Sequence, residues 1–152
     1  MEKNVINYSI IIPHYNIPEL LIRCLKSIPV REDIQVIVVD DCSPDADTYM
    51  SRFPELSRPN LEFYSTQKGG SAGRARNVGL DHAKGKWLIF ADADDYFTDK
   101  LDFFLKECVN CEEDIIYFDF KCVNSDDINT SSTIRHGSHF KAYFRNIKDN
   151  EI

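Results

Sequence analysis

The chain contains the stretch WLIFADADD at residues 87–95. Its apolar beginning is typical of a strand buried on both faces, and three carboxylates follow within the next four residues. Carboxylates this close repel one another and raise one another's pKa, and a bound Mg²⁺ or Mn²⁺ relieves that repulsion. In open α/β sheets, ligands bind at the carboxyl ends of strands. The stretch therefore predicts a metal-assisted phosphate site at the edge of a sheet.

Short β-rich runs alternate with helix-like segments along the whole chain, which indicates parallel strands joined by crossover helices. Asn16 is the expected N-cap of the first helix, with Pro18 near its first turn. The predicted fold class is α/β, a three-layer sandwich with a mainly parallel central sheet. We expect strands at about 9–12, 36–39, 61–64, 86–91 and 115–120, and later helices at about 46–52, 74–83 and 98–108.

Composition limits the class of protein. The chain has 152 residues, of which 43% are apolar, enough for the core of one ordinary domain. The formal net charge is −7, whereas proteins that bind nucleic acid by neutralising phosphates usually present a basic face. We therefore expect no nucleic-acid partner.

The amino-terminal residues and the cysteines indicate a reducing compartment. No secretory signal opens the sequence, and the apolar run at 6–13 is too short to span a bilayer, so we expect a cytoplasmic protein. Five cysteines form no compact framework. Cys108 and Cys111 have the spacing of redox and zinc motifs but lack a second pair, so buried thiols are the simpler interpretation.

Three loops should meet at one edge of the sheet, because each follows a strand of the predicted parallel set. They are residues 13–16, residues 40–45 and residues 92–95. A carboxylate there can accept a hydrogen bond from a nucleobase or a ribose, and Tyr15 can stack on a base. Each loop also has a plain interpretation. Asp40 and Asp41 could only form a turn, and Tyr15 could only pack.

A glycine-rich segment at 68–73 precedes the third helix, with Arg74 and Arg76 close by. Its backbone N–H groups and the positive helix end favour an anion. The segment matches neither a P-loop nor a dinucleotide fingerprint. Alternatively, the two arginines are solvated or form ion pairs with the acidic edge.

Four ordered motifs resemble those of family 2 glycosyltransferases with the GT-A fold, which is Rossmann-like. They are SIIIPHYN at 9–16, VIVVDDCSPD at 36–45, GRARNVGL at 73–80 and GKWLIFADADD at 85–95. The resemblance implies inverting transfer of a sugar from a nucleotide-sugar, usually a UDP-sugar, with Mg²⁺ or Mn²⁺ at the Asp-x-Asp motif. The implied acceptor is a glycan or a lipid-linked molecule in polysaccharide biosynthesis.

The resemblance also implies residue roles. Asp41 and the Pro13 to Tyr15 loop would contact the base, Asp92 would face the ribose or sugar, and Asp94 would be the main metal ligand with Asp92 beside it. The full candidate set for substrate binding is Pro13, His14, Tyr15, Asn16, Asp40, Asp41, Arg74, Arg76, Asp92 and Ala93.

The expected organisation is a nucleotide-sugar-binding core at 1–123, followed at 124–152 by a connector and the start of an incomplete acceptor-side region. In this family the general base comes well after the Asp-x-Asp motif. Asp119, Asp126 and Asp127 lie too near the fifth strand or in the connector, so the sequence assigns no base. We expect a truncated GT-A fold that binds donor.

Two alternatives stay open. One is a non-catalytic nucleotide-binding or interaction module, with self-association through an aromatic segment that contains Phe140, Tyr143 and Phe144. The other is an aspartyl-phosphate phosphatase of the Asp-x-Asp type, which the sequence resembles poorly because the motif follows the fourth predicted strand. A lipid-linked acceptor would place the protein at the inner face of the membrane.

Overall fold

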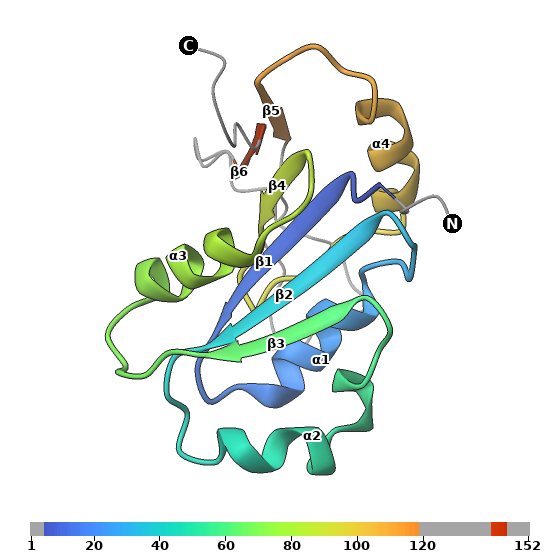
Figure 1. Cartoon of the computed structure of the whole chain (residues 1–152). Helices are drawn as coiled ribbons and strands as arrows, with labels where there is room; N and C mark the ends of the chain where they lie inside the picture. Colours follow the sequence, from blue (N-terminus) through green and yellow to red (C-terminus); the bar gives the residue numbers. More distant parts are fainter. Residues whose placement is uncertain (1–4, 119–140, 146–152) are drawn as a thin grey trace, which may run out of the picture.

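The computed structural model of the chain describes residues 5–118 and 141–145. These residues form one six-stranded sheet with helices on both faces (Figure 1). The elements are β1 (Tyr8–His14), α1 (Pro18–Lys26), β2 (Ile34–Asp40), η1 (Ala46–Thr48), α2 (Tyr49–Arg52), η2 (Pro54–Leu56), β3 (Leu61–Ser65), α3 (Ala72–His82), β4 (Trp87–Phe90), α4 (Leu101–Cys108), β5 (Ile115–Phe118) and β6 (Lys141–Arg145).

The strand order is β3-β2-β1-β4-β6-β5. The first four strands pair in parallel, and β6 runs antiparallel between β4 and β5. The predicted α/β class and the mainly parallel sheet are therefore confirmed. The sequence does not predict β6, because a short aromatic and basic run does not show that β4 and β5 leave a gap between them.

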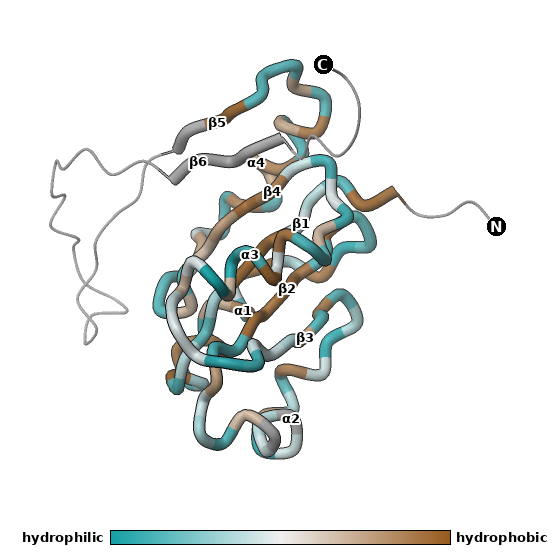
Figure 2. Tube along the Cα trace, turned by 60° about the vertical axis from the view of Figure 1, so that its left-hand side comes forward, coloured by the Kyte–Doolittle hydropathy of each residue, from teal (hydrophilic) through white to brown (hydrophobic). Residues whose placement is uncertain are grey.

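Alternate side chains of the central strands build two separate cores. Ile10 and Ile12 of β1 pack with α1, α2 and α4, whereas Ile11 packs with α3 on the opposite face. Figure 2 shows the hydrophobic colour running along β1, β2 and β4. Strands buried on both faces explain why these runs are continuously apolar rather than alternating.

Helix α3 lies very close to the sheet. A Cβ added at Gly79 would come within 2.4 Å of Cγ2 of Ile11, so only glycine fits at this contact. The side chain of Ala75, one turn earlier, is completely buried. Small residues therefore let the helix approach β1, and they bring the amino-terminal end of α3 to the carboxyl edge of the strands.

Two local expectations were wrong. The N-cap of α1 is Ile17 without a side-chain cap, because Asn16 adopts a φ of 52°, a left-handed conformation that asparagine tolerates. Helix α4 begins at Leu101, three residues after its expected start. Both errors fall at element ends, where local propensity is weakest as a guide.

The described cysteines Cys24, Cys42, Cys108 and Cys111 are all free thiols. Burial and the neighbouring Cys111 raise the pKa of Cys108 to about 11. A thiol that stays protonated is a poor nucleophile and a poor metal ligand. Cys108 thus has the properties of a packing residue.

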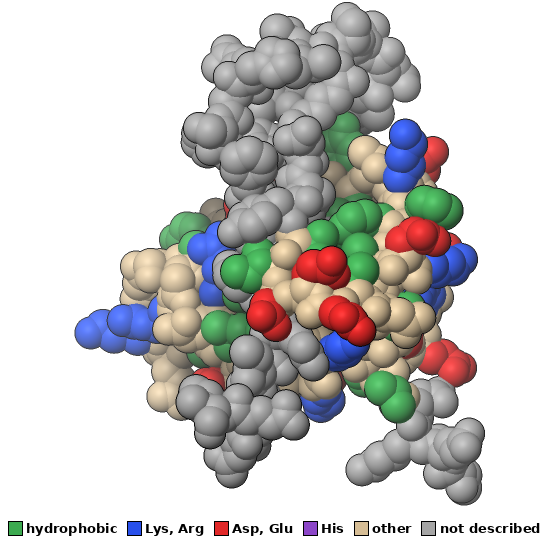
Figure 3. Space-filling view, turned by 90° about the horizontal axis from the view of Figure 1, so that it is seen from above, with side chains coloured by type: hydrophobic (Ala, Val, Ile, Leu, Met, Phe, Trp, Pro, Cys, Tyr) green, Lys and Arg blue, Asp and Glu red, His purple; other side chains and the backbone are tan. Residues whose placement is uncertain are grey.

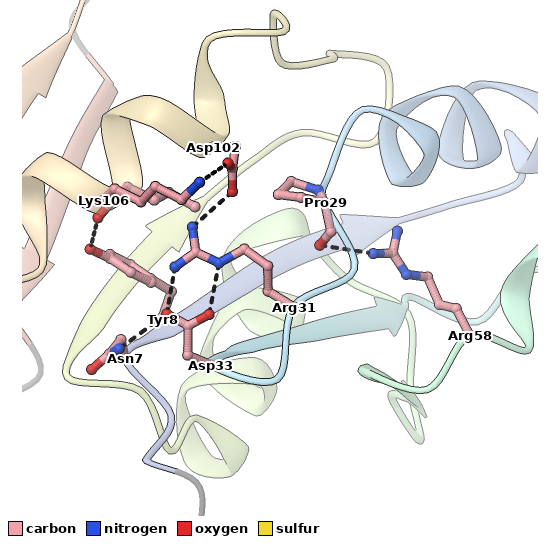
Figure 4. Close-up of polar contacts among 9 residues, drawn as sticks. Asn7, Tyr8, Pro29, Arg31, Asp33, Arg58, Asp102 and Lys106 are labelled. Atoms are coloured by element: carbon pink, nitrogen blue, oxygen red, sulfur yellow. Dashed lines mark hydrogen bonds and ion pairs between the residues drawn. The ribbon is translucent and has the colours of Figure 1, made fainter.

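An ion-pair network closes the amino-terminal edge of the sheet (Figure 4). Arg31 donates two hydrogen bonds to the Asp33 carboxylate, at 2.8 and 2.7 Å, and a third to Asp102 at 2.9 Å. Asn7 donates to Asp33 as well, at 3.0 Å. Partial burial alone would raise the pKa of Asp33, but the hydrogen bonds from Arg31 and Asn7 lower it overall.

Figure 3 shows acidic, basic and hydrophobic side chains interspersed on the face seen from above.

D33N tests this network. A carboxylate whose pKa is lowered in the folded state stabilises the fold above its ordinary pKa of 3.8, and that contribution disappears as pH falls through the lowered value. We expect D33N to lower the free energy of unfolding by about 1–2 kcal/mol at pH 7, and by progressively less below pH 3.8, in urea titrations. The control D99N, at an exposed position, should leave the free energy of unfolding unchanged both at pH 7 and below pH 3.8. If D33N lowered the free energy of unfolding by the same amount at every pH, the Asp33 carboxylate would not be the stabilising anion of this network.

Candidate functional site

A cavity of about 250 Å³ opens at the carboxyl edge of β1, β2 and β4. Three loops and the start of α3 contribute to it, because β1 pairs in parallel with β2 and β4 and the strands end together. The lining residues are Pro13, His14, Tyr15, Ile17, Asp41, Ala72, Asp92, Ala93 and Asp94. The three loops expected to meet at one edge therefore do meet there.

His14 and Asp40 form a buried pair beneath the cavity. Nδ1 of His14 lies 2.8 Å from Oδ1 of Asp40, and both side chains are fully buried. The hydroxyl and the backbone N–H of Ser43 also donate to the Asp40 carboxylate, at 2.5 and 2.7 Å. Ser43 Oγ in turn accepts from the backbone N–H of Asn16 at 2.8 Å. These bonds join the loop after β1 to the loop after β2.

The hydrogen bonds assign the tautomer of His14. The backbone N–H of Ile17 donates to Nε2 at 3.2 Å, so Nε2 carries no proton and Nδ1–H donates to Asp40. Burial lowers the pKa of His14 below its ordinary value of 6.5, although Asp40 acts in the opposite direction. The imidazole is therefore neutral at pH 7. His14 and Asp40 support the site, and Asp40 does not line the cavity.

Asp41 faces the cavity from the next position. Its carboxylate accepts from the hydroxyl of Thr66 at 2.8 Å and from the backbone N–H of Gly70 at 3.0 Å. The hydrogen bond from Gly70 is the main reason that the pKa of Asp41 is lowered. The backbone of Ser71 contributes in the same direction, so Asp41 is an anion with a fixed orientation at the cavity.

Three consecutive residues of the acidic loop after β4 lie in different environments. Asp92 accepts a hydrogen bond from Arg76 at 2.5 Å, Ala93 is buried in the core, and Asp94 is exposed in the cavity. Arg74 folds back and donates to the carbonyl oxygens of Lys68 and Gly69, at 2.7 and 3.2 Å. Of the two arginines, only Arg76 pairs with the acidic loop in the structure. Neither Arg74 nor Asn16 lines the cavity.

The donor set fits a metal only in part. Within residues 5–118 and 141–145, no group of three or more His, Cys, Asp or Glu side chains is placed to hold a cation. Asp92 and Asp94 supply hard oxygen donors on one cavity wall. Mg²⁺ typically binds proteins through one or two carboxylates and takes its other ligands from phosphates and water. The residues therefore fit a cation that arrives with a diphosphate.

A second cavity, of about 630 Å³, lies at the opposite edge of the sheet and is lined by Glu62, Lys84, Asn60 and seven other residues. The Glu62 carboxylate is already engaged, because it accepts from Lys84 and Gln35 at 2.8 Å and from Tyr64 at 2.7 Å. Size alone does not favour this cavity, since the described residues that line it include no aromatic ring that could stack on a base.

The sequence did not point to several supporting residues. Thr66 and Gly70 hold Asp41, Ser43 holds Asp40, and Ile17 and Ala72 line the cavity. Thr66 could have been found, because β3 ends at the same edge and its following residue belongs with the other three loops. Ser43 gives no signal in a sequence beyond that of a turn residue.

A family model described as "Glycosyl transferase family 2" matches residues 9–151. The chain belongs to this family. It is 34% identical over 107 residues to "Minor teichoic acid biosynthesis protein GgaB" of Bacillus subtilis (strain 168), a match that covers 64% of this chain and 12% of GgaB. It is 32% identical over 101 residues to "Poly(ribitol-phosphate) beta-N-acetylglucosaminyltransferase TarS" of Staphylococcus aureus (strain Mu50 / ATCC 700699), over 62% of this chain and 17% of TarS.

Solved structures show the same fold. S. aureus TarS 1–349 in complex with UDP superposes with a TM-score of 0.71 at 25% identity, over 91% of this chain and 46% of that one. Mannosyltransferase PcManGT from Pyrobaculum calidifontis, in complex with GDP-Man and Mn²⁺, has a TM-score of 0.54 at 23% identity and supports the fold alone, over 68% of this chain and 31% of that one. The GT-A fold is therefore confirmed, and the chain spans under half of each of these proteins. None of the helices within residues 5–118 and 141–145 has the length and apolarity to cross a membrane.

D40N tests the buried pair. Three donors converge on the Asp40 carboxylate, and an asparagine would turn an NH₂ group toward one of them. We expect a loss of about 2–3 kcal/mol in the free energy of unfolding, measured in urea. The matched variant D41N should cost less than about 1 kcal/mol, because Asp41 lies at an exposed loop. If D40N and D41N lowered the free energy of unfolding equally, Asp40 would not be the structural member of the two carboxylates.

Proposed function

We propose that this chain binds a UDP-sugar together with Mn²⁺ or Mg²⁺ and provides the donor side of an inverting hexosyl transfer. The acceptor would be a glycan or a lipid-linked molecule in polysaccharide biosynthesis, at the cytoplasmic face of the membrane in the second case. One observation carries the proposal. An exposed aromatic ring, an oriented carboxylate and two further carboxylates line a single cavity. Membership of family 2 and the structural likeness to UDP-bound TarS support it.

Asp41 and Tyr15 would select the base. An anionic carboxylate accepts hydrogen bonds and cannot donate them, so it favours a base with an N–H on its pairing edge. The uracil ring has one such N–H between two carbonyl groups, whereas cytosine and adenine have an acceptor nitrogen at the equivalent place. Tyr15 is 58% exposed beside Pro13, so its ring has a free face for stacking. Guanine also presents N–H groups on its pairing edge, so the carboxylate alone does not separate it from uracil. The likeness to UDP-bound TarS favours uridine of the two.

Asp94 and Asp92 would hold the cation that accompanies the diphosphate. When bound, the cation supplies the positive charge that offsets the negative charge developing on the leaving diphosphate. Asp94 is the more available ligand, because the carboxylate of Asp92 is shared with Arg76. Arg76 thereby orients Asp92, and Ala72 at the start of α3 lines the same cavity.

Transfer also needs a base that removes the proton from the acceptor hydroxyl. We assign that role to no residue of this chain. Asp119, Asp126 and Asp127 lie outside the described residues, as does Phe140 of the segment proposed for self-association, whereas Tyr143 and Phe144 belong to β6. The proposal for this chain therefore concerns donor binding first and transfer second.

Calorimetric titration of UDP with and without Mn²⁺ tests the proposal. We expect Mn²⁺-dependent binding in the wild-type chain, and D94N should weaken it at least about tenfold, since it removes the most exposed ligand. D95N is the matched control, because Asp95 follows in the same loop without lining the cavity, and we expect less than a threefold change. Absence of UDP binding under both conditions would contradict the proposed function, and tighter binding of GDP would contradict the assigned base.

A further inference from the structure

Side chains from α1 and its carboxyl-terminal end contact the backbone of the acidic loop after β4. A terminal nitrogen of Arg23 donates to the backbone carbonyl of Asp94, across 71 positions of sequence. One turn later, Oγ of Ser27 accepts from the backbone N–H of Phe97 at 2.9 Å. The same hydroxyl donates to the carbonyl of Cys24 at 2.6 Å, so its orientation is fixed within α1. Arg23 in α1 and Ser27, the C-cap residue directly after α1, thus hold both ends of the segment 94–97.

The surroundings of Arg23 indicate that this contact is specific. The guanidinium carbon lies 5.0 Å from the centre of the Tyr96 ring, a cation–π geometry. Nε of Arg23 is buried and has no hydrogen-bond partner among the residues that the structure describes. A solvent-facing arginine would hydrate that N–H. Here Nε is shielded, although the side chain as a whole is half-buried, and the guanidinium contacts both the Tyr96 ring and the Asp94 carbonyl.

The consequence for the loop is geometric. The N–H of Asp95 donates to the Asp92 carbonyl at 3.0 Å, which closes a tight turn, and Ala93 is anchored in the core. With the Asp94 carbonyl directed to Arg23, the carboxyl group of Asp94 lies on the cavity side. The positive charge of Arg23 also offsets repulsion within the acidic loop.

We propose that Arg23, assisted by Ser27, is a positioning residue that presents Asp94 to the cation and diphosphate. Arg23 does not line the cavity, so it acts through the loop backbone and not by touching the ligand. The proposal rests on the proposed function, and it adds a residue of α1 and the C-cap residue of that helix, neither of which belongs to a loop motif. We call Arg23 and Ser27 the α1 clamp.

The test is the Mn²⁺ concentration that gives half-maximal UDP binding to the full chain, followed by calorimetry or by fluorescence of a labelled UDP. R23M keeps the apolar stem and removes the donors, and we expect it to raise this concentration at least about tenfold. R23K keeps the charge and one donor and should raise it less. S27A, which loses the acceptor for Phe97 N–H, should raise it about threefold.

Arg58 provides a matched control. It also donates to backbone carbonyls, those of Leu25, Ile28 and Pro29, at the carboxyl-terminal end of α1 and just beyond it. Figure 4 shows the contact with Pro29. R58M should lower thermal stability and leave the Mn²⁺ midpoint within about twofold of the wild-type value. If R23M does not fold, R23K and S27A carry the test.

The outcomes separate the two proposals. If the wild-type chain binds UDP with Mn²⁺ and the midpoints of the clamp variants equal the wild-type midpoint, the clamp is wrong and the donor site stands. A shift in R58M as large as that in R23M would also overturn the clamp, because general loss of stability would explain both. If the wild-type chain binds no UDP, the proposed function fails, and the clamp fails with it.

Discussion

The candidate site depends on the parallel pairing of β1 with β2 on one side and with β4 on the other. This pairing requires strands that are apolar on both faces, and the sequence supplies them with Ile10, Ile11 and Ile12 between two layers of helices. Parallel strands end at the same edge, so residues far apart in the chain meet in one cavity. The close approach of α3, possible only with glycine at position 79, brings a helix amino terminus to the same edge.

The edge is acidic, and the structure shows how the fold tolerates this. Each carboxylate is held in its own way. Asp40 is buried with three donors, Asp41 accepts from a hydroxyl and a backbone N–H, and Asp92 pairs with Arg76. Asp94 differs, because only its backbone is held and its carboxyl group is exposed. Asp94 is therefore the most available carboxylate for the proposed cation, with Asp92 beside it.

The sequence predicted the features that come from long patterns. Continuous apolar runs gave the strands, and acidic residues directly after two of them indicated the ligand edge. Features that depend on three-dimensional neighbours were not predictable. His14 and Asp40 look like ligand residues in sequence, yet their side chains hydrogen-bond to each other, because the two residues are register partners in β1 and β2. β6 fills a gap that only the spatial strand order reveals, and Arg23 reaches a loop 71 residues away. The local sequence predicts Asn16 as the cap of α1, whereas Asn16 adopts a left-handed conformation and Ile17 is the N-cap.

The most direct test of the account is an amide chemical-shift map of the ¹⁵N-labelled chain titrated with UDP and Mg²⁺. The account predicts the largest shifts at the carboxyl edge, at Asp41, Gly70 and Asp94, and little change at Arg31, Asp33 and Asn60 on the opposite edge. Shifts concentrated around Asn60 and the larger cavity would contradict the account, as would a spectrum that does not respond to UDP.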